Sequence, residues 1–268
     1  MTTARRPLGL RALPQWVFWA LLAGCCLACP LAYLLLDKPV FEWQLRRGFV
    51  PFSNLWIDAF RLLGKAWLLV WLLLAWVATT SRWRRVYAPL LALLILALPL
   101  NATKLLVGRP RPRQKIAQMQ SQAEAATATA ELRGLSFPSG DTAAAIAVAA
   151  ALGAAAAWPW AVAALLAATG VGVMRVVDLA HHPSDVCAGA ALGLLVALAA
   201  IRLAPRWPPP AVGTWSRPVS ILGVVLIPIV TIVTHGTGMF VLLLKTYVPL
   251  MLAVCIIVNV RRSRGHLD

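Results

Sequence analysis

Charged residues are scarce in this sequence: only 13% of its 268 residues are Asp, Glu, Lys or Arg, and 60% are hydrophobic. A soluble domain has about 25% charged and about 45–50% apolar residues, so the composition excludes an ordinary soluble domain and predicts an integral membrane protein. Among the charged residues, the acidic ones are scarcer, with 9 Asp and Glu against 25 Lys and Arg. The net charge is therefore +16. Nucleic-acid binding is not expected, because the basic residues lie between apolar runs and at the ends of the chain.

Cysteine is also sparse, and all 5 cysteines lie inside apolar runs, at Cys25, Cys26, Cys29, Cys187 and Cys255. Their number is odd and their spacing matches no metal-binding motif, so we expect packed, unreactive thiols. We expect no cleavable signal peptide, because the first apolar run is long enough to span a bilayer.

Predominantly apolar runs of about 20 residues, the length that spans a bilayer, predict an all-α, polytopic bundle of about eight transmembrane helices. The runs lie at residues 14–36, 62–80, 87–107, 138–157, 160–180, 184–203, 218–235 and 239–259. We expect a six-helix core and two C-terminal helices. The chain divides into an N-terminal helix with an interfacial segment, a core with three motifs, and a C-terminal helix pair with a basic tail, at residues 1–61, 62–203 and 204–268.

Arginine clusters orient the predicted helices. They occupy the two chain ends and two connections, at residues 5–11, 82–85, 202–217 and 261–264. With eight spans, all of these clusters lie on one face, which the positive-inside rule makes cytoplasmic. Both termini are therefore expected in the cytoplasm.

Two segments of the opposite face stand out. Residues 37–61 mix aromatic, basic and polar positions, which predicts an interfacial amphipathic helix or loop. Residues 108–136 break the positive-inside rule by carrying Arg109, Arg111, Arg113, Lys115 and Arg133. Cations kept on this face indicate phosphate binding. Attraction to lipid headgroups is the alternative that this segment leaves open.

The first candidate motif is Lys104 followed by a turn rich in arginine. Pro110 and Pro112 end the helix, so that Arg109 or Arg111 can return to the level of Lys104. Lysine supplies a point charge and arginine a bidentate fork, and the two together suit a phosphoryl group. A lone lysine near a helix end would instead be explained by its reaching the membrane surface.

The second and third motifs lie at predicted helix starts. Pro138-Ser139-Gly140 predicts a helix N-terminus whose backbone N–H groups attract an anion, although the tripeptide also occurs in ordinary turns. His181 and Asp185 are one helical turn apart, and Asp185 is expected to hold one imidazole nitrogen so that the other is free for attack. Arg175 precedes them, and interhelical hydrogen bonding is the alternative for a lone histidine.

Together the three segments resemble the signature of the type 2 phosphatidic acid phosphatase superfamily, K-x6-R-P, P-S-G-H and S-R-x5-H-x3-D. The matching positions are Lys104, Arg111, Pro112, Pro138, Ser139, Gly140, Arg175, His181 and Asp185. The resemblance covers about residues 60–203. It implies a phosphate-binding set made of Lys104, Arg111, Ser139, Gly140 and Arg175. It also implies that His181 is the nucleophile, forming a phosphohistidine that Asp185 helps to orient, at an outward-facing site that needs no metal or other cofactor.

The sequence departs from this signature at two positions. Met174 replaces the Ser before Arg175, and Asp141 stands where the family has the His that protonates the leaving group. Asp141 could serve as the general acid if the substrate phosphate causes it to bind a proton. Otherwise the leaving group must need little protonation, as a phosphate does, or the protein is weakly active. Asp178 and His182 are candidate substitutes for the acid, at spacings that favour neither.

We therefore expect a metal-independent lipid phosphatase of a bacterial inner membrane, acting on a lipid phosphomonoester or diphosphate at the periplasmic face. A lipid phosphotransferase using the same phosphohistidine is the first alternative. A non-catalytic protein that binds or translocates a lipid phosphate is the second, mainly because of Asp141. The sequence leaves the lipid headgroup and the oligomeric state open.

Overall fold

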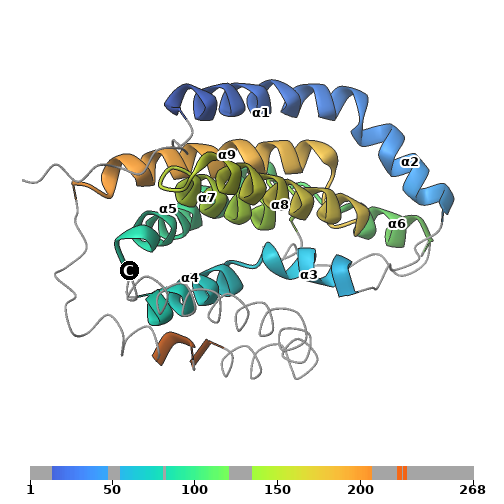
Figure 1. The fold of residues 1–268 in the computed structure, drawn as a ribbon. Coiled ribbons are helices and arrows are strands. Elements are labelled where there is room, and N and C mark those ends of the chain that lie inside the picture. The colour runs from blue at the N-terminus through green and yellow to red at the C-terminus, as the bar shows by residue number, and fades with distance from the viewer. Residues whose placement is uncertain are drawn as a thin grey trace, which may run out of the picture.

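The computed structural model describes residues 14–47, 55–80, 83–120, 135–206, 222–224 and 226–227. These parts of the chain are helical apart from turns and one isolated bridge between Pro110 and Leu135. The helices, drawn in Figure 1, are α1 (Gln15–Leu35), α2 (Asp37–Arg47), α3 (Leu55–Leu63), α4 (Ala66–Thr80), α5 (Trp83–Val107), α6 (Pro112–Gln120), α7 (Gly140–Gly153), α8 (Trp158–Val177) and α9 (Pro183–Leu203).

The predicted all-α class is confirmed for these residues. The first six predicted runs correspond to α1, α4, α5, α7, α8 and α9. Four of these helices, α1, α5, α8 and α9, are long and apolar enough to cross a membrane, and α4 and α7 are shorter apolar helices. The two runs predicted at 218–235 and 239–259 lie almost entirely outside the described residues, so the total of eight stays a prediction.

The start of the second predicted run is wrong. The sequence predicts one helix from residue 62, but α3 ends at Leu63 and α4 begins at Ala66. The apolar pair Leu62 and Leu63 hides this break in the hydropathy pattern. The segment predicted as an interfacial helix or loop contains α2 and most of α3, whereas residues 48–54 lie outside the described part.

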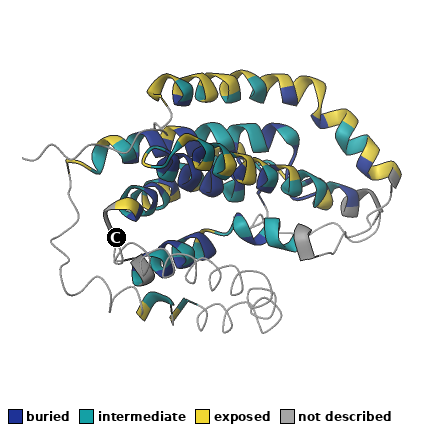
Figure 2. Cartoon of the chain, viewed as in Figure 1, coloured by how far each residue is buried: buried dark blue, intermediate teal, exposed yellow. Residues whose placement is uncertain are grey.

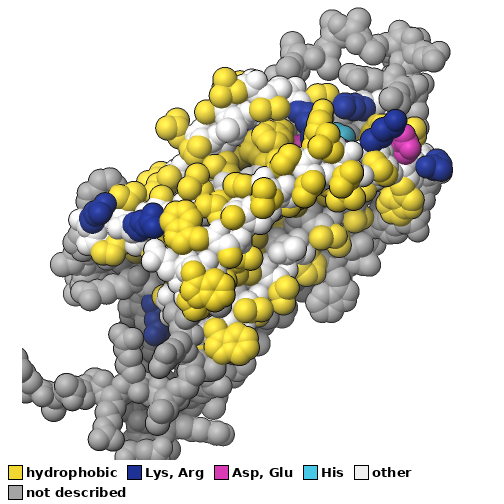
Figure 3. Space-filling model, turned by 90° about the horizontal axis from the view of Figure 1, so that it is seen from above, with side chains coloured by type: hydrophobic (Ala, Val, Ile, Leu, Met, Phe, Trp, Pro, Cys, Tyr) yellow, Lys and Arg dark blue, Asp and Glu magenta, His cyan; other side chains and the backbone are white. Residues whose placement is uncertain are grey.

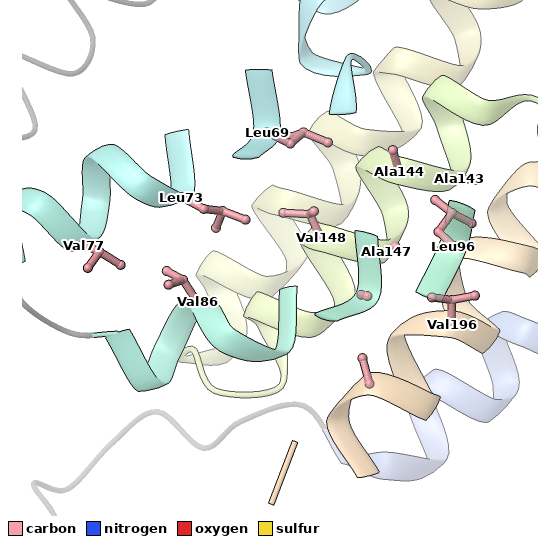
Figure 4. Close-up of a cluster of buried hydrophobic side chains, with 12 residues drawn as sticks. Leu69, Leu73, Val77, Val86, Leu96, Ala143, Ala144, Ala147, Val148 and Val196 are labelled. Carbon is pink, nitrogen blue, oxygen red and sulfur yellow. The ribbon is translucent and has the colours of Figure 1, made fainter. Parts of the chain in front are cut away.

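Helices α5, α7, α8 and α9 form a central layer, with α1 on one side and α3 and α4 on the other (Figure 1). Small residues let these helices approach closely, and α7 is buried along nearly its whole length. Leu73, Leu96, Val148 and Val196 show how side chains of α4, α5, α7 and α9 meet in one buried cluster (Figure 4). A second cluster joins Phe18 of α1 to residues of α7, α8 and α9.

Large apolar side chains cover the outside of the bundle. α1 is exposed along most of its length (Figure 2), and Leu98 and Leu106 of α5 are 81% and 85% exposed. Outward apolar faces of this size on helices of spanning length are typical of surfaces that contact lipid. Together with the composition, they indicate a membrane protein.

Basic side chains gather towards the two ends of the helices, with apolar side chains between them (Figure 3). One end joins the C-terminal ends of α5 and α8 to the N-terminal ends of α4, α7 and α9. The opposite end carries Arg85 at the start of α5 and Arg202 and Arg206 at the end of α9. The sequence motifs all lie at the first of these ends.

Candidate functional site

Backbone hydrogen bonds tie the three motif segments together. The N–H of Ser136 donates to the Arg109 carbonyl at 2.7 Å, and the N–H of Ser139 donates to the Asp185 carbonyl at 2.9 Å. The N–H of Arg113 donates to the Leu179 carbonyl at 3.1 Å. Segments far apart in the sequence therefore form one connected framework, which fixes where their side chains point.

The close approach of α7 and α9 depends on two glycines of α9. A Cβ on Gly189 would lie 2.5 Å from the Ser139 carbonyl oxygen, and one on Gly193 would lie 2.5 Å from the Ala143 oxygen. Only a residue without Cβ fits at such distances. Gly189 thereby sets the start of α7 directly against the first turns of α9.

Ser139 is the N-cap residue of α7, as the second motif predicts for a helix start. Its hydroxyl lies 2.8 Å from the Thr142 hydroxyl and 3.5 Å from the Thr142 N–H, which donates to it. The side chain is fully buried. Ser139 thus holds the helix start in shape, and Gly140 is the first residue of a helix whose N-terminal N–H groups have no partner within the helix.

A left-handed residue ends α8 and turns the chain towards His181. Leu179 has a φ of 56°, its N–H donates to the Val176 carbonyl, and the N–H of Ala180 donates to the Arg175 carbonyl. This is the hydrogen-bond pattern of a Schellman motif, which usually has glycine at this position. Leu179 is 4% exposed, so packing of its side chain offsets the cost of about 1–2 kcal/mol for a left-handed residue.

His181 is buried with a defined tautomer. Its Nδ1 lies 2.7 Å from the Ser136 carbonyl oxygen, which can only accept a hydrogen bond. Nδ1 therefore carries the hydrogen, and in the neutral ring Nε2 has a free lone pair. Burial, with the charges of Arg175 and Arg111, lowers the pKa of His181 well below its usual range. The imidazole is thus neutral near pH 7, as a nucleophile requires.

Asp185 does not make the direct hydrogen bond to His181 that the sequence predicts. Its Oδ2 is 3.9 Å from Nδ1, because the Ser136 carbonyl occupies the position next to that nitrogen. Asp185 instead accepts hydrogen bonds from the Ser136 hydroxyl and from the His182 N–H. Its carboxylate therefore fixes the segment that contains Ser136, whose carbonyl in turn holds the imidazole.

Arg109 and Arg111, which the sequence leaves as alternatives beside Lys104, point to different places. Arg109 is bound on the far side of Asp185, with Nη1 at 2.8 Å from Asp185 Oδ1 and Nη2 at 2.7 Å from Asp37 Oδ2. Asp37 also accepts hydrogen bonds from the Ser184 N–H and hydroxyl. This network joins the α1–α2 junction to the first turn of α9.

Lys104, Arg111 and Arg175 form a cationic group beside His181. All three charges act on the imidazole, and Arg111 and Arg175 also act on Lys104. The Nε atoms of both arginines are buried. Arg111 Nε has no hydrogen-bond acceptor among the described residues, and Arg175 Nε lies 3.1 Å from the Asp141 carboxylate without the geometry of a hydrogen bond. Burial and neighbouring cations lower the pKa of Arg111 to about 10, so it stays charged near pH 7. Buried cationic donors without acceptors are suited to an anion.

Asp141 lies between two cations. Lys65 Nζ donates to its Oδ2 at 3.0 Å, and Arg175 Nε is 3.1 Å from the same oxygen. Both cations contact the same carboxylate oxygen, whereas the general acid expected from the sequence must offer a proton to the substrate. Asp141 is not needed as a cap for α7, because Ser139 is the N-cap residue of that helix.

The two candidate substitutes for the acid have other surroundings. Asp178 accepts two hydrogen bonds from Arg61, at 2.8 and 2.6 Å, and so links α8 to α3. His182 packs near Phe41, with 6.2 Å between ring centroids, and its Nε2 has no hydrogen-bond partner in the described structure. Burial, followed by the charge of Arg109, lowers the pKa of His182 to about 4. Its imidazole is therefore neutral near pH 7 and cannot serve as the general acid.

The comparison with protein families identifies the part of the chain that contains this site. Residues 85–209 match the family model of the PAP2 superfamily. Proteins of this superfamily are generally phosphatases, so the match supports a phosphatase-type activity on phosphate esters. The match includes every motif residue from Lys104 to Asp185 and leaves out Asp37 and Lys65. No curated protein and no solved structure matches the chain.

Three residues of this site were not predicted from the sequence: Ser136, Asp37 and Lys65. Ser136 acts mainly through its carbonyl, so its side-chain type gives no signal. Asp37 and Lys65 are charged residues next to apolar runs in a chain with only 9 acidic residues. A search for the partner of each rare charge at a membrane edge could have found them.

Proposed function

We propose that this protein is a membrane lipid phosphatase that hydrolyses a lipid phosphomonoester or diphosphate through a phosphohistidine on His181. The observation that carries the proposal is the neutral imidazole of His181, with Nδ1 bound to the Ser136 carbonyl and Nε2 free beside three cations. An unprotonated nitrogen of a buried imidazole, next to a cationic anion site, is the arrangement that nucleophilic attack on phosphorus needs.

In the proposed reaction, Nε2 of His181 attacks phosphorus and the bond to the leaving-group oxygen breaks. The positive charge that develops on the imidazole is stabilised by Asp185, 3.9 Å from Nδ1, and by the hydrogen bond to the Ser136 carbonyl. Water then attacks the phosphohistidine and releases inorganic phosphate, which restores the free imidazole.

Lys104, Arg111 and Arg175 are proposed to bind the phosphoryl oxygens. Their charge would stabilise the transition state with side-chain cations in the place of a metal ion. Gly140 is proposed to add backbone N–H donors from the first turn of α7, whose geometry Ser139 maintains. Asp141 is proposed to act on the leaving-group side of this cluster, next to Arg175.

A lipid substrate is proposed because of the apolar surface around the site. Leu105, Leu106 and Val107 form the end of α5 directly after Lys104 and are 64%, 85% and 50% exposed. An acyl or prenyl chain could lie along this surface while its phosphate reaches the cations. The opposite end of the bundle carries Arg85, Arg202 and Arg206, and the positive-inside rule would then make the site periplasmic in a bacterial inner membrane.

Phosphate release by the purified full chain in detergent tests this proposal. We expect phosphate release from at least one substrate among phosphatidate, phosphatidylglycerol phosphate and a polyprenyl diphosphate, and none from His181→Ala. Equal release by wild type and His181→Ala would refute the proposal. With substrate labelled in the phosphoryl group, label in free phosphate identifies a hydrolase, and label retained in a second lipid identifies a phosphotransferase.

A further inference from the structure

The turn between α3 and α4 brings a lysine from outside the matched family region into the site. The N–H of Lys65 donates to the Leu62 carbonyl at 2.8 Å, and its carbonyl accepts from the Leu69 N–H at 3.0 Å. The preceding Gly64 packs against the start of α7, where an added Cβ would be 2.6 Å from Asp141 Cβ. The absence of a side chain at Gly64 thus lets the turn pack directly against Asp141.

Lys65 and Asp141 form a short ion pair, with Nζ 3.0 Å from Oδ2. The side chain of Lys65 is 32% exposed and that of Asp141 is 19% exposed, so the pair lies at the edge of the site and not in the core. Because the carboxylate also contacts Arg175, at 3.1 Å, it connects the lysine directly to the cationic group that is proposed to bind phosphate.

The charges around the site indicate where Lys65 lies relative to the nucleophile. Arg175, Arg111 and Lys104 act on His181, and Lys65 acts on Lys104. Lys65 is linked to this group through Asp141, whose Oδ2 contacts both Lys65 Nζ, at 3.0 Å, and Arg175 Nε, at 3.1 Å. In phosphoryl transfer the attacking and leaving atoms are roughly in line, on opposite sides of phosphorus. We infer that Lys65, at the more exposed edge of this group, stands on the side where the leaving group departs.

We propose that Lys65 is a further catalytic residue that gives its ammonium proton to the leaving-group oxygen, and that Asp141 is the positioning residue that holds it there. This role rests on the phosphatase function proposed above. It also explains how a chain with an ion-paired Asp141 supplies a proton: the donor is the cation of the pair. The ion pair with Asp141 then keeps the Lys65 side chain aimed at the site between turnovers.

The proposed step balances in both halves of the reaction. First, the bond between Nε2 and phosphorus forms, the bond to the leaving-group oxygen breaks, and a proton passes from Lys65 to that oxygen, which leaves a neutral amine. In the second half, the Lys65 amine takes a proton from the attacking water while the bond between phosphorus and Nε2 breaks. The products are the alcohol and phosphate, and both Lys65 and His181 return to their initial states.

The Lys65→Arg variant distinguishes the effect of a positive charge at this position from the effect of proton donation. Arg keeps the positive charge and can bind Asp141, but it does not release a proton in proteins. In Lys65→Arg we expect kcat for phosphatidate, whose alkoxide leaving group needs a proton, to fall by about 10²-fold or more. We expect hydrolysis of 4-nitrophenyl phosphate, whose leaving group needs no proton, to change by less than about threefold. Lys65→Gln should show the same contrast if Lys65→Arg does not fold.

Lys38→Arg is the matched control, because Lys38 is 84% exposed and pairs only loosely with Glu42, at 3.9 Å. It should leave both rates unchanged. Equal changes on both substrates in Lys65→Arg and Lys65→Gln, or no change on either, would overturn the role of Lys65 and make the pair a structural link between the α3–α4 turn and α7. Wild-type protein that releases phosphate from none of phosphatidate, phosphatidylglycerol phosphate and a polyprenyl diphosphate would instead contradict the proposed phosphatase function, and with it this role. Wild-type protein that cleaves only the diphosphate would overturn the role of Lys65 alone, because that leaving group needs no proton.

Discussion

A single methyl group at Gly189 should disable the site without altering any chemical group in it. In Gly189→Ala the new Cβ would lie 2.5 Å from the Ser139 carbonyl oxygen and 3.3 Å from Ser139 Cβ. The start of α7 is already tied to α9 at this point, because the Ser139 N–H donates to the Asp185 carbonyl at 2.9 Å. The clash must therefore push the start of α7 away from α9.

The size of the displacement follows from the contact distance. The two atoms must separate by about 0.5 Å to reach 3.0 Å and by about 0.9 Å for an ordinary contact at 3.4 Å. Overpacking of this kind costs about 1–3 kcal/mol of stability, and the helix preference of alanine over glycine offsets up to about 1 kcal/mol. A misplacement near 1 Å at a reacting centre lowers the rate by about 10²-fold. We expect kcat to fall by about that factor while most of the protein stays folded.

The assay compares kcat and denaturation in detergent for Gly189→Ala and for Gly24→Ala. Gly24 lies in α1 with nothing within 4 Å of an added Cβ, so the same substitution there should leave both kcat and stability unchanged or slightly improve stability. Wild-type kcat in Gly189→Ala would refute the inference that the contact between α7 and α9 sets the geometry of the site. A loss of activity in Gly24→Ala would show that the substitution acts in some other way.

Three further predictions follow from the site and the fold. Asp185→Asn removes the charge that pairs with Arg109 at 2.8 Å. Because Arg109 keeps its pair with Asp37, at 2.7 Å, the loss of stability should stay below the about 3–5 kcal/mol of an uncompensated buried charge, together with a fall in kcat; thermal unfolding and phosphate release measure both. The free energy of unfolding should fall as the pH drops from 6.5 to about 4, because the lowered pKa of His182 makes the unfolded chain bind more protons than the folded one in that range. His182→Gln should flatten this part of the plot of unfolding free energy against pH. In a cysteine-free background, Arg113→Cys and Arg206→Cys should be labelled from opposite sides of the membrane, and labelling from one side would contradict the proposed orientation.

The helical part of this fold follows from hydropathy because each apolar run must satisfy its own backbone polar groups in a membrane. The runs at 87–107 and 184–203 agree with α5 and α9 to within a few residues. The break before α4 could not be read in this way, since Leu62 and Leu63 continue the apolar pattern up to Gly64. What places that break is the tertiary contact of Gly64 with Asp141 and Val171.

The site was predicted as a set of residues but not as a set of contacts. Lys104, Arg111, Arg175 and His181 do share one group of interacting charges. The spacing of His181 and Asp185 predicts that they face each other, and they do, yet the Ser136 carbonyl takes the hydrogen bond. Sequence spacing along one helix cannot show that a loop 45 residues earlier supplies the nearer acceptor.

The most direct test of the account is to trap the intermediate on His181. The purified full chain is mixed with substrate labelled in the phosphoryl group, quenched in alkali within the first turnovers, and digested for mass spectrometry. The account predicts a phosphoryl group, stable in alkali and lost in acid, on the peptide that contains His181, and none in His181→Ala. A protein that releases phosphate while no label is found on His181, or while label is found on another residue, would contradict it.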